Sequence, residues 1–212
     1  LTFRGKDELL RWLRRIFKLR ASSLLVLAGT FFLPLGIGLL QYAFYRLLGG
    51  APDFPAAIPW YQYLAYLLPT ALLTGGNEEP GWRGFALPAL LERFPPVTCA
   101  VILGIIHSLW HLPLMEQYDT TTGWYLFNLF PLTFVLNWFY LKSSYAIIPV
   151  MLFHAGTNVI GSFIPTPAVV LGGIGTPLFL RGCAYWGMAI VLLIATKGRL
   201  GYDSKAPDQL SG

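Results

Sequence analysis

Six long apolar segments constrain the fold of this chain more than any other feature of its sequence. About 20 consecutive apolar residues cross a bilayer as a helix, and a hydrophobic fraction of 55% is too high for a soluble domain of 212 residues. We therefore predict an all-α, polytopic transmembrane helix bundle with about six spans, formed as a single domain over residues 1–212. The predicted spans cover approximately residues 22–48, 60–76, 96–115, 122–141, 146–164 and 176–196.

Residues 7–20 are predicted to form a basic amphipathic helix at the membrane interface. The apolar positions recur at helical spacing and the others are mostly Arg or Lys: the apolar set is Leu9, Leu10, Leu13, Ile16 and Phe17. Such a helix lies on an anionic membrane face. The basic charge sits beside a span, so the pI of about 9.3 indicates membrane lipids as partners and not a nucleic acid.

The remaining Lys and Arg residues predict the orientation. Threading six spans alternately places most of them on the side of the N-terminal cluster, namely Arg83, Arg93, Lys142, Lys197, Arg199 and Lys205. Cytoplasmic loops carry an excess of basic residues, so we expect a multi-pass protein of the cell (inner or plasma) membrane with both termini cytoplasmic. The sequence begins at Leu1, not Met, and we expect residues to precede it.

Two adjacent carboxylates and an arginine lie between these apolar segments. Ionisable groups in such surroundings are costly and mark functional sites. Glu79 and Arg83 are four residues apart and can pair on a helix, whereas Glu78 points elsewhere and can face a cavity as a general base. The alternative is a structural ion pair with a spare carboxylate at the interface.

The same stretch is too long for one straight span. A continuous helix over residues 60–93 would overshoot the bilayer. We expect a break near the carboxylates, where Gly and Pro are frequent, followed by a second helix over about 82–93. Broken backbone at membrane depth is tolerated where it lines a wet cavity, which a water-using site requires.

The chain contains three histidines, and all lie in predicted spans. His107 and His111 are one helical turn apart and face the same way. Their spacing matches a metal-binding pair but lacks the Glu that follows the first His in zinc proteases, so one of them can instead be a packing residue. His154 and Asn158 are also one turn apart. A neutral imidazole and a carboxamide can donate two hydrogen bonds to an oxyanion, or simply join helices.

In their order and spacing these residues resemble the CPBP family of intramembrane proteases, which includes the type II CAAX prenyl endopeptidases and bacteriocin-processing or immunity proteins. The family pattern is Glu-Glu-x-x-x-Arg, Phe-x-x-x-His and His-x-x-x-Asn. It falls within a motif-bearing core over residues 60–164, on Glu78, Glu79, Arg83, His111, His154 and Asn158. The chain departs from the pattern at His107, which replaces the Phe and adds either a polar ring of similar size or a further ligand or proton carrier.

The resemblance implies an intramembrane endopeptidase acting on a membrane-associated peptide. Glu78 would be the general base for a water that His111 helps to hold. His154 and Asn158 would stabilise the oxyanion, and Arg83 would orient the site through Glu79.

The sequence leaves alternatives open for the cofactor and for the class of function, and it does not indicate the oligomeric state. The site would need either no cofactor or a zinc ion, bound by Glu78, His111 and His154 with His107 as a possible fourth ligand. The alternative functions are a non-catalytic immunity or scaffold protein and an ion-coupled transporter that uses the same Glu and His residues. The chain shows no internal repeat, which counts against a transporter.

Overall fold

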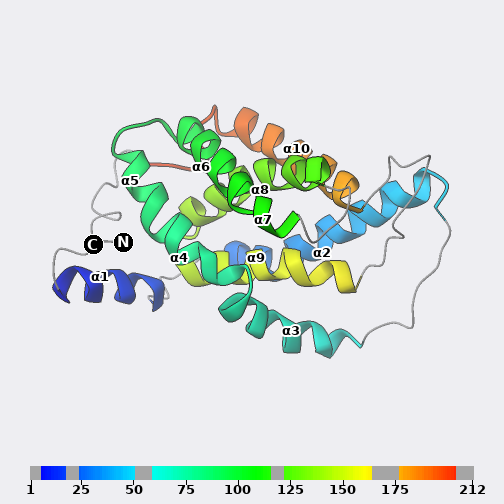
Figure 1. The fold of residues 1–212 in the computed structure, drawn as a ribbon, viewed down its shortest axis with the longest axis horizontal. Coiled ribbons are helices and arrows are strands. Elements are labelled where there is room, and N and C mark those ends of the chain that lie inside the picture. Colours follow the sequence, from blue (N-terminus) through cyan, green and yellow to red (C-terminus); the bar gives the residue numbers. More distant parts are fainter. Residues whose placement is uncertain (1–5, 18–23, 51–58, 116–121, 164–176, 204–212) are drawn as a thin grey trace.

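Each predicted apolar segment contains a helix in the computed structural model, which describes residues 6–17, 24–50, 59–115, 122–163 and 177–203 (Figure 1). The longer helices of the bundle are α2 (Leu24–Leu47), α3 (Trp60–Leu73), α6 (Pro96–Trp110), α8 (Thr122–Lys142), α9 (Ile147–Val159) and α10 (Pro177–Ala195). Within the described residues all regular structure is helical, which confirms the predicted all-α class.

Two of these helices are long and apolar enough to cross a membrane by length and composition, over Val26–Leu47 and Leu178–Ala195. The apolar helices α6 and α9 are shorter, and α3 has only 14 residues. With 21 residues, α8 has the length of a span, but its sequence includes Asn128, Thr133 and Asn137. The structure thus supports two of the six predicted spans on these criteria.

The outward faces of several helices are apolar. Large exposed side chains include Leu27, Phe32 and Leu39 on α2, Leu64, Leu68 and Leu72 on α3, and Ile190, Val191 and Ile194 on α10. An exposed apolar surface of this extent is unusual on a water-soluble monomer. It is the surface expected of helices that contact lipid.

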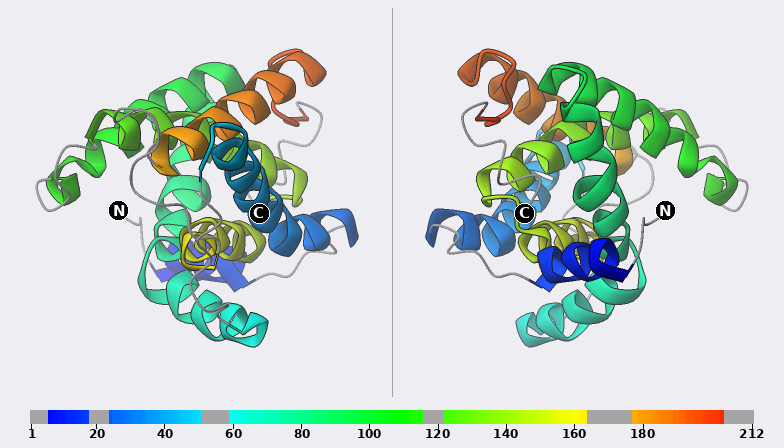
Figure 2. Two further views of the ribbon diagram at one scale, coloured as in Figure 1. Left: turned by 90° about the vertical axis from the view of Figure 1, so that its right-hand side faces the viewer. Right: turned by 90° about the vertical axis from the view of Figure 1, so that its left-hand side faces the viewer.

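Helix α9 is the hub of the bundle. It packs against α2, α3, α8 and α1, and most of its side chains are buried. Helix α8, in addition to contacting α9, packs against α6 and α10. These helices share the main apolar core with α9. Helix α3 lies on the outer side of α9 (Figure 2), where a separate small cluster holds it: Leu67, Ala71 and Ala155, with Tyr63 and Leu152 packed against them.

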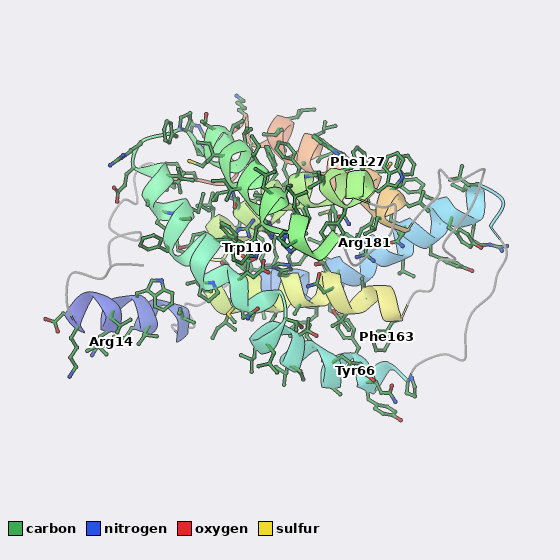
Figure 3. All side chains as sticks on the ribbon, in the orientation of Figure 1. Arg14, Tyr66, Trp110, Phe127, Phe163 and Arg181 are labelled. Atoms are coloured by element: carbon green, nitrogen blue, oxygen red, sulfur yellow. The ribbon has the colours of Figure 1, made fainter. Side chains whose placement is uncertain are left out.

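The N-terminal helix α1 (Lys6–Phe17) confirms part of the predicted amphipathic helix, while residues 18–20 lie outside the described residues. Ile16 is buried, and Trp12 and Leu13 pack against the main core. Arg14 lies on the exposed side of the helix (Figure 3). One face of α1 therefore packs on the bundle next to α9, and Arg14 lies on a face that stays exposed.

One arginine of α10 connects three helices near the C-terminal end of α9. Arg181 of α10 donates from Nε to Oε1 of Gln41 on α2 (3.1 Å) and from Nη1 to the carbonyl oxygen of Thr157 on α9 (3.4 Å). A cation within an apolar span is tolerated where it faces the bundle interior and meets polar groups. Arg181, labelled in Figure 3, thus stabilises the packing of α10 on its neighbours.

Close packing between α8 and α10 predicts a sharp difference between two glycines of α10. A Cβ added at Gly182 would lie 2.5 Å from Cδ1 of Phe127, whereas one added at Gly187 meets no atom within 4 Å. We expect Gly182→Ala to lower the free energy of unfolding by about 1–3 kcal/mol through overpacking. Thermal unfolding in detergent micelles measures this, with Gly187→Ala as the matched control on the same helix. Equal melting temperatures for the two variants would contradict this account of the interface.

Candidate active site

The chain breaks directly before the two carboxylates, as predicted. α3 ends at Leu73, and Gly75 has a φ of +91°, a backbone conformation that residues with a Cβ rarely adopt. The chain then continues through a 3₁₀ turn, η1 (Gly76–Glu78), into α4 (Glu79–Gly81), a π-helical turn η2 (Trp82–Ala86) and α5 (Leu87–Leu91). π-helical turns are rare and occur frequently at functional sites.

Gly76 seats this segment against its neighbours. A Cβ at this position would lie 2.6 Å from the Cα of Ala71 on α3 and 2.7 Å from the carbonyl oxygen of Met151 on α9. The backbone of η1 therefore contacts both helices at a distance that a side chain would prevent. This close approach brings Glu78 and Glu79 into the interior of the bundle.

Glu79 and Arg83 form the predicted ion pair. Nη1 of Arg83 lies 3.0 Å from Oε1 of Glu79, and both side chains are 0% exposed. Burying two charges is costly unless each is paired and hydrogen-bonded. The guanidinium meets this condition through two further acceptors on α8: Oδ1 of Asn137, 3.1 Å from Nε, and the carbonyl oxygen of Thr133, 3.5 Å from Nη2.

The same carboxylate oxygen binds His154. Nδ1 of His154 lies 2.6 Å from Oε1 of Glu79, and because an ionised carboxylate only accepts, Nδ1 carries the proton and donates it. A neutral His154 therefore has a lone pair at Nε2, which changes our expectation of a neutral imidazole that donates to an oxyanion. Nε2 becomes a donor only when the ring is doubly protonated.

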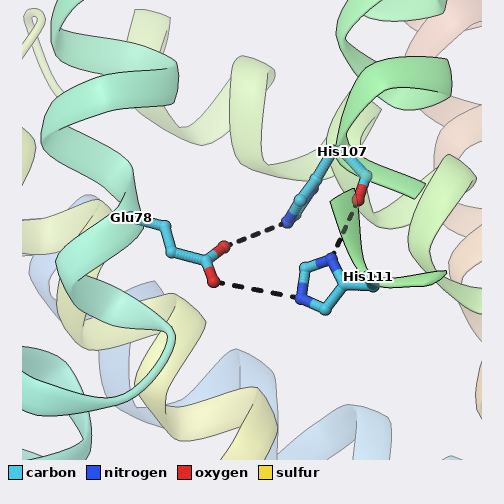
Figure 4. A group of neighbouring side chains, drawn as sticks. All are labelled: Glu78, His107 and His111. Atoms are coloured by element: carbon cyan, nitrogen blue, oxygen red, sulfur yellow. Dashed lines mark hydrogen bonds and ion pairs between the residues drawn. The ribbon is translucent and has the colours of Figure 1, made fainter. Parts of the chain in front are cut away.

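Glu78 turns away from this pair and faces α6 (Figure 4). Its Oε2 lies 3.3 Å from Nε2 of His107, and its Oε1 lies 3.9 Å from Nε2 of His111. The indole Nε1 of Trp82 donates to Oε2 at 3.4 Å. The Glu78 side chain retains 23% exposure, compared with 0% for Glu79. Of two consecutive carboxylates, one is sequestered and the other is accessible.

The side chains of His107 and His111 lie close together, but His107 is within helix α6 whereas His111 follows its last residue. Their ring centroids are 4.9 Å apart. The predicted segment 96–115 is interrupted: α6 ends at Trp110, His111 is its C-cap residue, and α7 (Leu112–Met115) follows. Pro113, two residues after His111, cannot continue the backbone hydrogen bonding of the helix, which explains the interruption.

Asn158 and His154 both face Gly75. A Cβ at Gly75 would overlap the side-chain amide nitrogen of Asn158 and lie 3.5 Å from Nε2 of His154. Asn158 itself is exposed. The two side chains thus flank the point where the chain breaks, at the accessible edge of the site.

The structure brings the predicted site residues together, in two linked groups. One group consists of Glu79, Arg83 and His154, and the other of Glu78, His107 and His111. The rings of His107 and His154 join them with centroids 6.0 Å apart. The group whose possible metal-ligand atoms all lie within 4.8 Å of one another is Glu78, His107 and His111. It contains His107 in place of His154, which differs from the zinc ligand set that we expected.

Two residues of the site were missed by the sequence reasoning. Thr133 contacts His107, with Oγ1 3.2 Å from Nδ1, and Asn137 binds Arg83. Neither residue was among the site residues predicted from the sequence. Both are polar residues one turn apart in an apolar helix, and this spacing is the signal that could have identified them.

Comparisons with known proteins agree with the motif pattern. Residues 59–160 match the family described as type II CAAX prenyl endopeptidase Rce1-like. The chain is also 29% identical, over 162 residues, to the CAAX prenyl protease 2 of Methanococcus maripaludis. That alignment covers 70% of this chain and 60% of the relative, so the chain spans less than two thirds of the relative's length.

The contact between Asn137 and Arg83 predicts a stability difference between two asparagines of α8. Asn137→Ala leaves Nε of a fully buried guanidinium without its acceptor, and we expect a loss of about 1–3 kcal/mol in the free energy of unfolding. In Asn128, which is also buried, Oδ1 has no hydrogen-bond partner, so Asn128→Ala should cost less. Thermal or denaturant unfolding in detergent compares the two, and the reverse order would argue against the network.

Proposed function

We propose that this chain, whose residues 59–160 match the Rce1-like family of type II CAAX prenyl endopeptidases, is an intramembrane endopeptidase that hydrolyses a peptide bond of a membrane-associated substrate. The observation that carries the proposal is the contrast between Glu78 and Glu79. The buried carboxylate is held by Arg83 and His154. The accessible one faces two imidazoles, where a water can be bound and deprotonated.

In the proposed reaction Glu78 acts as the general base. It accepts a proton from a water that His111 helps to hold, and the oxygen of that water adds to the carbonyl carbon of the scissile bond. The tetrahedral intermediate collapses with cleavage of the C–N bond, and the proton on Glu78 passes to the leaving amine. This scheme needs no cofactor. A zinc ion at the same place would instead polarise the water or the carbonyl group.

His154 and Asn158 are proposed to stabilise the negative oxygen of the intermediate. Their side chains flank Gly75, so Nε2 of a doubly protonated His154 and the amide of Asn158 can donate toward one point. Arg83 holds Glu79 in place, and Glu79 in turn fixes the ring of His154 through Nδ1. Donors that are fixed before the reaction stabilise developing charge without reorganising.

The substrate class follows from the names of the family and of the relative. Both refer to CAAX prenyl proteins, in which a cysteine near the C-terminus carries an isoprenoid. We propose a C-terminal, lipid-modified peptide as the substrate. The exposed apolar faces of α2 and α3 support a substrate that arrives from the lipid phase.

We also propose the six-span arrangement with both termini in the cytoplasm. Basic residues gather at one end of the bundle: a Cβ at Gly201 would contact the Lys142 side chain, and one at Gly198 would contact Val97. The end of α8, the start of α6 and the residues after α10 therefore meet, together with Lys197 and Arg199. The excess of positive charge at this end supports its placement on the cytoplasmic side.

The first test replaces the proposed base. We expect Glu78→Gln to reduce cleavage of a farnesylated C-terminal peptide by about 10²–10⁴-fold, the contribution of a general base, with no loss of thermal stability. The assay uses purified protein in proteoliposomes and a fluorogenic peptide. Glu92→Gln, a change of the same type at an exposed position, is the matched control and should retain full activity. Undiminished cleavage by Glu78→Gln would remove Glu78 from the mechanism.

The second test concerns the oxyanion site. A Cβ at Gly75 would displace the Asn158 amide, and alanine is strained at a φ of +91°. We expect Gly75→Ala to lower kcat on the order of 10²-fold, as the loss of one oxyanion donor does. Gly36→Ala on α2, where a Cβ meets nothing within 4 Å, is the control. Wild-type kcat in Gly75→Ala would argue against the role of Asn158.

A further inference from the structure

The Nε2 atoms of His107 and His111 both point at the carboxylate of Glu78 (Figure 4). The three ligand atoms lie within 4.8 Å of one another. His107 is 1% exposed, and its Nε2 makes no hydrogen bond although Oε2 of Glu78 is only 3.3 Å away. A buried ring nitrogen without a hydrogen bond is an unfavourable arrangement that calls for a partner.

The hydrogen bonds on the far side of each ring determine where its proton lies. Oγ1 of Thr133 donates to the carbonyl oxygen of Leu129, so it accepts from Nδ1 of His107. Nδ1 of His111 lies 2.8 Å from the carbonyl oxygen of His107, which can only accept. Both neutral rings therefore carry their proton on Nδ1 and present a lone pair at Nε2.

Two lone pairs and an ionised carboxylate converge without a proton between them. Such a group repels itself unless a further proton or a metal cation lies between the ligand atoms. Metal-bound histidines commonly donate their other N–H to a hydroxyl or carbonyl group in this manner.

We propose that Glu78, His107 and His111 bind one divalent transition-metal ion of the zinc type. Zinc takes nitrogen and oxygen ligands at about 2.0–2.2 Å in a tetrahedron, which places them about 3.4 Å from one another. The three ligand atoms, which lie within 4.8 Å of one another, would therefore have to move closer together to bind the ion. Three protein ligands leave a fourth position open, as in catalytic zinc sites. The partial exposure of Glu78 gives access to that position.

The proposal shares Glu78 and His111 with the proposed protease site but depends on His107. The family pattern has Phe at this position, and Phe cannot bind a metal. The third ligand is thus a feature in which this chain differs from the pattern. His107 also distinguishes the two possible sets of zinc ligands. His154, which belongs to the other set, already donates its Nδ1–H to Glu79 and lies outside the group of converging atoms.

The test measures metal binding directly. Protein purified without an oligohistidine tag is stripped with a chelator and titrated with Zn²⁺ or Co²⁺; metal content is measured by mass spectrometry, and the Co²⁺ absorption spectrum reports the coordination geometry. We expect one ion per chain with a tetrahedral Co²⁺ spectrum. His107→Phe and His111→Gln should each weaken binding by about 100-fold or more, since loss of a direct ligand exceeds the effect of an outer-shell partner.

His154→Gln is the matched control, because the chain has only three histidines and this one is outside the proposed set. It should bind the ion as wild type does. Binding that survives His107→Phe but is lost in His154→Gln would overturn the proposal in favour of the other ligand set, and no binding by the folded wild-type protein would overturn it altogether. Thermal unfolding of each variant shows whether it is folded, with His107→Gln as a second substitution if His107→Phe is unstable.

These outcomes are separable from the protease proposal. Cleavage that requires Glu78 in a protein that binds no metal would reject the metal site and keep the protease. One bound ion per chain without cleavage of any prenylated peptide would keep the metal site and reject the protease.

Discussion

The ion pair between Arg83 and Glu79 is the interaction on which the candidate site depends. Both side chains are fully buried, with Nη1 and Oε1 3.0 Å apart. Removal of either partner would leave an uncompensated charge in the interior, at a cost of about 3–5 kcal/mol. Because Arg83 also binds Asn137 on α8 and Glu79 binds His154 on α9, the pair connects the segment after Gly75 to two core helices. The site and the packing of the bundle are thus stabilised by the same contacts.

This pair also explains how two neighbouring carboxylates can have different tasks. Successive residues in a helical turn point in different directions, so Glu79 faces Arg83 and α9 while Glu78 faces α6. Oε1 of Glu79 is held by both Arg83 and His154, while its buried Oε2 has no hydrogen-bond partner among the described residues. Glu78 has only a long hydrogen bond from Trp82 and two imidazole nitrogens nearby. An accessible base next to a neutralised carboxylate is a suitable arrangement for activating a small polar reactant in apolar surroundings.

Spacing along the chain predicted those features that depend on a single helix. The Glu79–Arg83 pair, the common side of His107 and His111, and the break before the carboxylates all follow from local geometry. Contacts between helices could not be predicted in this way, because the periodicity of α8 identifies a polar face but not the helix that the face meets. The contact of Asn137 with Arg83 and the bond from His154 to Glu79 were therefore not anticipated. Pro113 was a local signal for the end of α6 that our segment boundary of 115 overlooked.

The separate attachment of α3 has a consequence for the way in which the bundle can open. Its small apolar cluster with α9 is not part of the main core, and local opening requires less free energy where less apolar surface is exposed by it. Parting α3 from α9 therefore costs less than parting α8 from α6 or α10. Gly75 lies at the end of α3, next to His154 and Asn158. The side of the bundle next to the site is therefore held by the smaller of the two apolar clusters, and this is the side from which the proposed lipid-borne substrate would enter.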